Sequence, residues 1–234
     1  MDIMQKTVPN ISIVLPCQNE EKGLGFCLAE IEKTVREHGL RAEVIVSDSS
    51  SDQSPQIAKN HGAILVKHDK KGYGRAYLEG LKAARGNYII MADADNTYDF
   101  TKIPDFIGQL DRGFDLVIGN RLGGPMEADA MPWANRHIGT PVLSLLLKIA
   151  FGATIKDSQS GMRAIKKESL EKLKLKTQGM EFASEMIAKA LIHKLKITEI
   201  PIPYRKRVGQ SKLRPIQDAL RHMWFMTGYF FFSA

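Results

Sequence analysis

Short apolar runs alternate with helical repeats of apolar residues over the first half of the chain. Residues 11–15, 43–46, 63–66, 88–91 and 115–118 are mostly apolar runs rich in β-branched side chains, which predict buried strands. Residues 20–37, 75–85 and 103–110 carry apolar side chains three or four positions apart and predict helices, and the Ser54–Pro55 pair predicts the start of another. This alternation indicates an α/β fold: a mostly parallel, Rossmann-like sheet flanked by helices on both faces.

The second half of the chain is less regular. Helices are predicted over residues 140–151 and 181–193, and strands over 161–165 and 197–202. Residues 204–215 are basic, contain Gly209 and lack hydrophobic periodicity, so they predict a mobile loop. Because no internal repeat or low-complexity linker interrupts the pattern, we expect a single domain over residues 1–221.

The last residues of the chain differ in character from the rest. Residues 223–226 and 229–232 are apolar and mostly aromatic, and an exposed cluster of this kind indicates a binding surface. We expect residues 222–234 to begin a membrane-associated segment, with a helix docked on its own domain as the alternative. The longest apolar run elsewhere, residues 141–150, is shorter than the roughly 20 residues that span a bilayer.

The net charge of the chain indicates an anionic partner but does not identify it. The chain has 33 basic and 26 acidic residues in 234, a net charge of +7, which suits an anionic partner such as a phosphorylated ligand or an acidic membrane surface. No nucleic-acid recognition motif accompanies the charge. The two cysteines and six histidines lack metal-ligand spacing, and the N-terminus lacks a signal-peptide pattern, so a cytoplasmic location is expected.

Polar side chains follow several of the predicted strands at the point where each strand ends. They are Pro16, Asn19 and Glu20 after the first strand, Asp48 after the second, Asp93, Ala94 and Asp95 after the fourth, and Arg121 after the fifth. In an open parallel sheet, ligands bind beyond the carboxyl ends of the strands. The sequence therefore predicts one binding site along this edge of the sheet.

The Asp93–Ala94–Asp95 motif and a glycine-containing loop suggest what this site binds. Two carboxylates around one small residue are hard oxygen ligands, which suit Mg²⁺ or Mn²⁺ and a bridging diphosphate. The alternative is an acidic turn that caps the next helix. Lys71 and Gly72 precede a predicted helix, where a glycine permits close backbone approach and the helix N-terminus favours an anion. Walker and dinucleotide-binding glycine motifs are absent.

Eight segments, in this order, resemble the landmarks of GT-A family 2 glycosyltransferases: PCQNEE, VSDSSSD, KGYGRA, DADNT, GNR, DSQSGMRA, GMEFASEM and RKRVGQSKLR. The likeness runs from about residue 11 to 221 and is strongest to the polyprenyl-phosphate branch, which contains the dolichol-phosphate mannose and glucose synthases. It implies a membrane-anchored enzyme at the cytoplasmic face that moves a hexose from a nucleotide-sugar to a polyprenyl phosphate, with inversion at the anomeric carbon.

The resemblance also implies residue roles. The base and ribose pocket would be lined by Pro16, Asn19, Glu20 and Asp48, and the nucleotide-sugar would also contact Lys71, Gly72 and Ala94. The metal and diphosphate would be held by Asp93 and Asp95, and the diphosphate would be covered by Arg207, Lys212 and Arg214. The acceptor phosphate would be received by Arg121, Arg136 and Arg163. Asp157 would stand near the acceptor, where it would act as a base or orient Arg163.

Two departures from the family pattern leave the donor open. Relatives often have two aspartates after the second strand, and here the first is Ser47. In some mannose synthases a metal-binding glutamine follows the motif, and here Thr97 stands there. UDP-glucose is favoured as donor, with GDP-mannose and UDP-N-acetylglucosamine as alternatives. A nucleotidyltransferase and a non-catalytic nucleotide-sugar-binding module are the competing classes. The oligomeric state is not indicated by the sequence.

Overall fold

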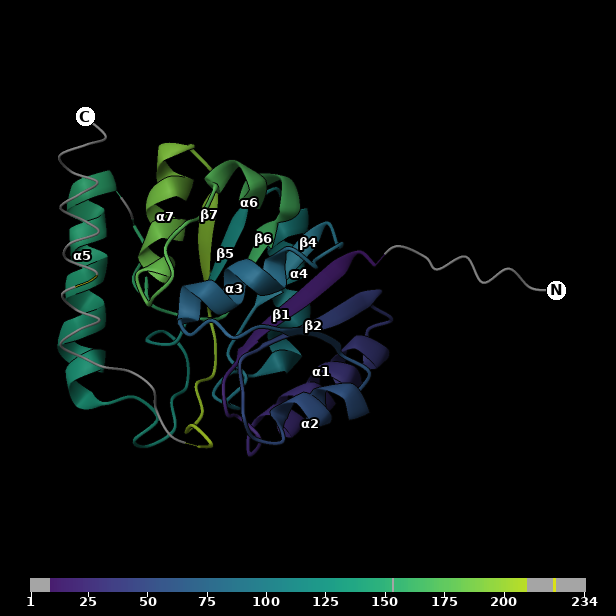
Figure 1. Ribbon diagram of the computed structural model, residues 1–234. Helices are drawn as coiled ribbons and strands as arrows, with labels where there is room; N and C mark the ends of the chain where they lie inside the picture. The colour runs from purple at the N-terminus through teal and green to yellow at the C-terminus, as the bar shows by residue number, and fades with distance from the viewer. Residues whose placement is uncertain (1–8, 153, 210–220, 222–234) are drawn as a thin grey trace.

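The computed structural model describes residues 9–152, 154–209 and 221, which form an α/β fold around one seven-stranded sheet (Figure 1). The strands are β1 (Ile11–Cys17), β2 (Ala42–Asp48), β3 (Ile64–Lys67), β4 (Tyr88–Met91), β5 (Leu116–Asn120), β6 (Arg163–Lys166) and β7 (Ile197–Pro201), in the spatial order β3-β2-β1-β4-β6-β5-β7. The mostly parallel sheet predicted from the sequence is confirmed.

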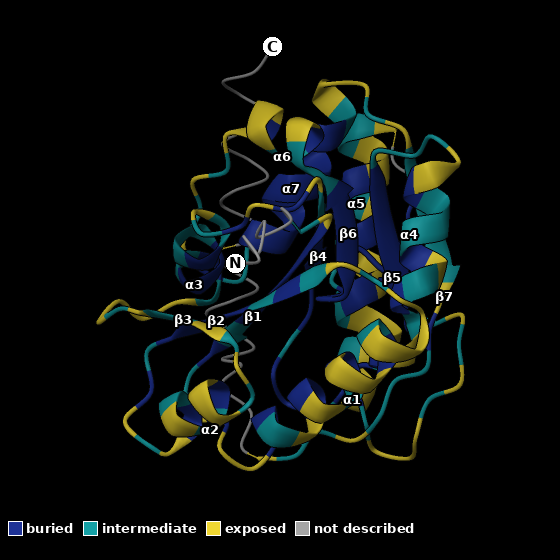
Figure 2. Cartoon of the chain, turned by 90° about the vertical axis from the view of Figure 1, so that its right-hand side faces the viewer, coloured by how far each residue is buried: buried dark blue, intermediate teal, exposed yellow. Residues whose placement is uncertain are grey.

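Helices cover both faces of the sheet, and each face has its own apolar core (Figures 1 and 2). One face packs against α1 (Leu24–Glu37), α2 (Ser54–Asn60) and α4 (Ile103–Asp111). The other packs against α3 (Tyr73–Leu81), α5 (Thr140–Phe151), α6 (Lys167–Leu173) and α7 (Phe182–Ile192). Alternate residues of β1 explain the division: Ile13 and Leu15 face the first core, and Val14 faces the second.

One strand runs against the others, which the sequence pattern did not predict. Strand β6 pairs antiparallel with β4 on one side and with β5 on the other. The segment before β6 therefore reaches the same edge of the sheet as the carboxyl ends of β4 and β5. This reversal brings Asp157 and the residues around it to the predicted ligand edge.

Helix α5 separates into a buried and an exposed face. Ser144 and Leu147 are buried, and Leu143 and Leu146 pack against the second core. Leu145 and Ile149 are 53% and 68% exposed. One face of the helix therefore packs against the core, and the other is exposed. Among the described residues, no helix has both the length and the apolar content needed to cross a membrane.

Candidate active site

Asp95 lies directly beyond β4 and is held in place by the residue two positions later. Its Oδ1 accepts hydrogen bonds from the Thr97 backbone N–H at 3.1 Å and from the Thr97 hydroxyl at 2.6 Å. Thr97 is itself buried. Thr97, which stands where some relatives have a metal-binding glutamine, therefore orients the Asp95 carboxylate. This leaves Asp95 Oδ2 to face the ligand edge.

Asp93, the first carboxylate of the motif, has a raised pKa. Burial raises the pKa of Asp93 to about 7, and the charge of Asp95 adds to this rise. The charges of Arg207 and Arg121 and a hydrogen bond from Tyr73 act in the opposite direction. Its Oδ1 is buried without a hydrogen-bond partner among the described residues. A bound cation would stabilise the charge of this unpaired, buried oxygen beside a second carboxylate.

Gly161 packs closely against Asp93 and leaves no room for a side chain. A Cβ at this position would lie 2.8 Å from Asp93 Oδ2 and 3.0 Å from the Tyr73 hydroxyl oxygen. The Gly161 backbone N–H donates to the Tyr98 hydroxyl oxygen at 2.6 Å, which fixes the turn before β6. Asp93 and Asp95 offer the carboxylate oxygens that Mg²⁺ and Mn²⁺ prefer, and in the described part of the chain no group of three or more acidic, histidine or cysteine side chains is placed to hold a metal.

Arg207 connects the motif to the end of β1. Its guanidinium contacts Glu20 Oε1 through Nη2 and Asp95 Oδ2 through Nη1, the second at 3.0 Å. The backbone is anchored too, because the Val208 N–H donates to the Asp95 carbonyl oxygen at 3.0 Å and the Arg205 N–H donates to the Thr97 carbonyl oxygen at 2.9 Å. Residues 205–208 of the predicted loop are thus tied to the Asp93–Ala94–Asp95 segment, and the change of order of this loop on ligand binding stays a prediction. Lys212 and Arg214 lie outside the described residues.

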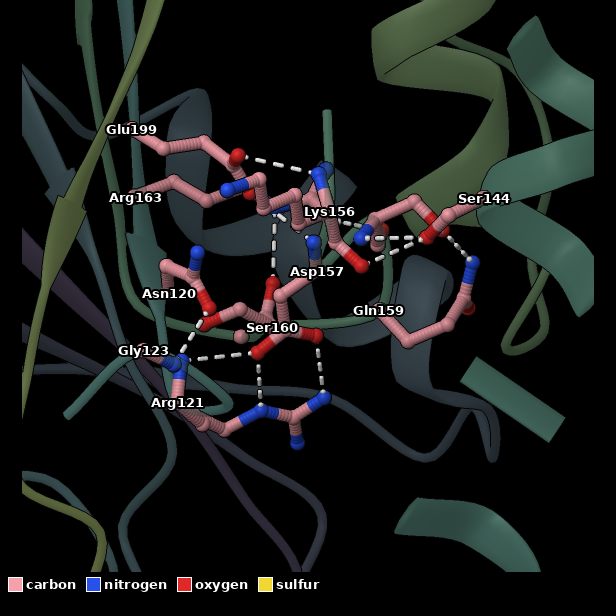
Figure 3. A network of polar contacts seen from close by, with 12 residues as sticks. Asn120, Arg121, Gly123, Ser144, Lys156, Asp157, Gln159, Ser160, Arg163 and Glu199 are labelled. Atoms are coloured by element: carbon pink, nitrogen blue, oxygen red, sulfur yellow. Dashed lines mark hydrogen bonds and ion pairs between the residues drawn. The ribbon is translucent and has the colours of Figure 1, made fainter. Parts of the chain in front are cut away.

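Arg121 and Asp157 form a buried, bidentate ion pair (Figure 3). Arg121 donates from Nε to Asp157 Oδ2 at 2.8 Å and from Nη2 to Oδ1 at 2.7 Å, and its backbone N–H donates to Oδ2 at 2.9 Å. The Tyr204 ring lies against the guanidinium, with 5.1 Å from Arg121 Cζ to the ring centroid. Since both carboxylate oxygens of Asp157 are engaged by Arg121, this geometry favours a positioning role for Asp157 over a base.

The two other arginines expected at the acceptor site lie in different surroundings. Arg163 donates from three guanidinium nitrogens to the backbone carbonyl oxygens of Ser160, Ala183 and Ser158, each at 2.8 Å, and is 2% exposed. It therefore supports the β6 turn, and Asp157 pairs with Arg121 rather than orienting Arg163. Arg136 is exposed on the short π-helix Asn135–Gly139 before α5, and within the described part of the chain its side chain forms no ion pair.

The glycine loop before α3 packs against protein rather than forming an open anion cradle. The N–H groups of Gly74 and Arg75 donate to the carbonyl oxygens of Gly179 and Gln178, at 3.2 and 3.0 Å. Gly72 has φ 131°, a conformation that favours glycine, and a Cβ there would collide with the Gln178 carbonyl oxygen. The structure therefore assigns Gly72 to packing, and Lys71 is exposed beside it.

We expect Gly74→Ala to destabilise the protein by about 1–3 kcal/mol, because the added methyl group would overlap the Thr177 carbonyl oxygen and lie 2.9 Å from Phe182 Cβ. The matched control is Gly108→Ala in α4, where a Cβ meets nothing within 4 Å; it should stabilise by about 0.5–1 kcal/mol through helix propensity. Urea unfolding of both variants measures the difference. Equal stabilities would contradict the packing role of Gly74.

The ends of β1 and β2 form the remaining part of the site. Asp48 is fully buried, and its Oδ2 has no hydrogen-bond partner among the described residues. Asn19, with φ 53°, accepts from the Ser51 N–H at 2.9 Å and so ties the two strand ends together. Pro16 stands opposite Ser47 in the parallel register. Glu20, Asp48, Asp93 and Asp95 thus converge as the sequence predicts, and Ala94 is buried between the two motif carboxylates.

Ser47, which replaces an aspartate of the family pattern, points away from the ligand edge. Its hydroxyl donates to the Ala76 carbonyl oxygen at 2.6 Å and lies 3.2 Å from His68 Nε2. Because the Ser47 proton is already directed to Ala76, His68 donates from Nε2 to Ser47 and presents Nδ1 as an acceptor. That Nδ1 atom is buried without a partner among the described residues. No sequence motif pointed to His68, Tyr204 or Tyr98, because their roles come from contacts across the fold.

Buried carboxylates and arginines held in ion pairs thus lie at the carboxyl ends of the strands, and such an edge is typical of α/β enzymes that bind phosphate-containing substrates. Residues 12–174 match the family model described as glycosyl transferase family 2. The chain belongs to this family, and it is a family 2 glycosyltransferase.

Two relatives from Haloferax volcanii are similar over most of the chain. The low-salt glycan biosynthesis hexosyltransferase Agl6 is 40% identical over 228 residues, 95% of this chain, but the match spans only 55% of the length of that relative. A dolichyl-phosphate hexose transferase is 32% identical over 209 residues, 89% of each chain.

Solved structures share the fold at lower identity. Glucosyl-3-phosphoglycerate synthase from Mycobacterium tuberculosis has a TM-score of 0.73 at 20% identity, covering 94% of this chain and 79% of that one. Mannosyl-3-phosphoglycerate synthase from Rubrobacter xylanophilus has a TM-score of 0.73 at 18% identity, covering 92% and 72%. At these identities the likeness shows the GT-A architecture alone.

Proposed function

We propose that this chain transfers a hexose from a nucleotide-sugar to a polyprenyl phosphate of the dolichyl type. The observation that carries the proposal is the placement of Arg121 near the Asp93–Asp95 pair: Arg121 would receive the acceptor phosphate, and a metal held by the two carboxylates would bind the donor diphosphate. The name of the dolichyl-phosphate hexose transferase supports the same acceptor. UDP-glucose is the favoured donor, and a GDP-mannose-dependent enzyme is the alternative.

The proposed reaction is a direct displacement. A phosphate oxygen of the acceptor forms a bond to the anomeric carbon, while the bond from that carbon to the diphosphate oxygen breaks and the electron pair leaves with the nucleoside diphosphate. Attack from the face opposite the leaving group inverts the anomeric configuration. Asp93 and Asp95 would hold Mg²⁺ or Mn²⁺, which, when bound, offsets the charge of the leaving group.

The acceptor does not require a strong base. A phosphate monoester has its second pKa near ~6 and is ionised at neutral pH. Asp157 is fully buried and pairs with Arg121, so its proposed contribution is to hold the guanidinium that receives this phosphate. Arg136 is exposed before α5, and its proposed contribution is a second positive charge for the same phosphate.

The apolar face of α5 suggests how the lipid substrate is reached. Ile138, Val142, Leu145 and Ile149 are all at least 47% exposed, and their spacing of four, three and four residues places them on one side of the helix. Trp133, 69% exposed, precedes them. We propose that this face docks on the cytoplasmic side of a membrane, where the polyprenyl phosphate presents its headgroup.

Release of nucleoside diphosphate tests the proposed reaction. The chain is incubated with UDP-glucose, GDP-mannose or UDP-N-acetylglucosamine and Mn²⁺, with and without a polyprenyl phosphate in detergent. We expect release with one donor to depend on the acceptor and to yield a glycosylated lipid phosphate. Pyrophosphate release would indicate a nucleotidyltransferase, and binding without turnover would indicate a binding module; either result would overturn the proposal.

Docking through α5 is tested with vesicles containing anionic lipid. Leu145→Gln with Ile149→Gln should lower vesicle binding at least about tenfold, because each buried aliphatic side chain contributes about 1.5–3 kcal/mol. Phe26→Gln is the matched control, since Phe26 is 64% exposed on α1. Co-sedimentation measures both variants. Equal binding by the double variant and the wild type would place the docking face elsewhere.

A further inference from the structure

Glu199 is a half-buried carboxylate on the edge strand β7 that no motif and no site described so far includes. It stands opposite Ile118 in the parallel register with β5. Its two oxygens accept from two consecutive backbone N–H groups: Oε2 from Lys156 at 2.9 Å and Oε1 from Asp157 at 2.8 Å (Figure 3). One carboxylate thus fixes the backbone of the segment that carries Asp157.

The contacts continue from this backbone to the arginine of the site. Glu199 holds the Asp157 main chain, the Asp157 carboxylate holds Nε and Nη2 of Arg121, and Figure 3 shows the third guanidinium nitrogen turned away from Asp157. Tyr204 covers one face of the guanidinium. The direction in which Arg121 presents its remaining donor therefore depends on where Glu199 places residues 156–157.

The chemistry of Glu199 suits this task better than a neutral side chain would. Two adjacent N–H donors point at one group, and only a carboxylate offers two acceptor oxygens, each in a charge-assisted hydrogen bond. A glutamine would accept from one donor and direct its own N–H group at the other. The strand anchors the side chain on regular structure, and such support improves the precision of a site.

We propose that Glu199 is a positioning residue for acceptor phosphate binding: it sets the orientation of Arg121 through Asp157. The inference rests on the proposed function, because it takes a phosphate monoester as the ligand of Arg121. The donor side of the site is built from β1, β2 and β4, and none of those residues bonds to Glu199 among the described residues. Loss of Glu199 should therefore affect the acceptor and spare the donor.

The experiment compares Glu199→Gln with wild type in two separate assays. Transfer to a polyprenyl phosphate should fall about 10–100-fold, with a raised KM for the acceptor, since loss of a supporting partner of a ligand-binding group costs about this much. The affinity for the nucleotide-sugar with Mn²⁺, measured by calorimetry, should stay within about twofold of wild type. The matched control is Glu168→Gln, an exposed acid on α6, which should change neither quantity.

A purely structural role would give a different pattern. A parallel loss of donor affinity and acceptor KM, or unchanged transfer by Glu199→Gln, would overturn the inference. If Glu199→Gln does not fold, Glu199→Asp carries the same test, because it keeps the charge and shortens the reach by one methylene. Geranyl phosphate, a short soluble acceptor, provides a direct binding readout and should bind more weakly to either variant. If the wild type itself does not use polyprenyl phosphate, the proposed function fails instead.

Discussion

Asp95→Asn is expected to lower sugar transfer by about 10³-fold or more while the fold persists. The asparagine retains an Oδ1 that accepts from Thr97, but it removes a negatively charged ligand of the metal that offsets charge in the transition state. The variant also removes the like charge that helps to raise the pKa of Asp93. Loss of the ion pair with Arg207 opposes this gain, so thermal stability without ligand should stay near that of wild type.

The comparison with an ordinary surface acid makes this result specific. Asp105→Asn changes an exposed residue of α4 whose ion pair with Lys102 is at the surface, and it should retain transfer and stability. Initial rates are measured for both variants at several Mn²⁺ concentrations, beside wild type in EDTA. Full transfer by Asp95→Asn, or undiminished wild-type transfer in EDTA, would refute metal dependence.

Arg207→Gln is expected to tighten Mn²⁺ binding in the absence of nucleotide by about tenfold, yet to lower transfer by about 10²-fold. Arg207 contacts Asp95 Oδ2, the oxygen that a cation would also use. Removing this competing positive charge should favour the metal, with a coupling of the size common between linked sites. Removing the same charge from the departing diphosphate should slow the chemical step.

The neighbouring residue provides the control for this prediction. Lys206 is exposed, and its backbone N–H, rather than its side chain, donates to Glu127 at 2.7 Å. Lys206→Gln loses the same charge a residue away and should change metal affinity less than twofold. Titration of free Mn²⁺ by electron paramagnetic resonance measures both variants. Weaker metal binding by Arg207→Gln would show that Arg207 supports the cation site instead of competing with it.

Local patterns explain how much of the fold the sequence predicted. A buried strand and an amphipathic helix each require apolar side chains at a fixed spacing, so β4 and α5 were predicted with the bounds that the structure shows. Helix α6 was missed because its seven residues are too short and too polar to show a helical repeat. The reversed direction of β6 was missed because strand direction depends on the connection and leaves no local signal.

The sequence by itself determined the chemistry at the strand ends: Asp48, Asp93 and Asp95 follow apolar strands, and parallel strands deliver their carboxyl ends to one edge. The tertiary structure decided the partners. Arg121 meets Asp157 across 36 positions, and Glu199 meets the same segment from β7 across 42. Such pairs form because buried charges require partners at hydrogen-bonding distance, and which residues supply them depends on strand order and direction rather than on spacing along the chain.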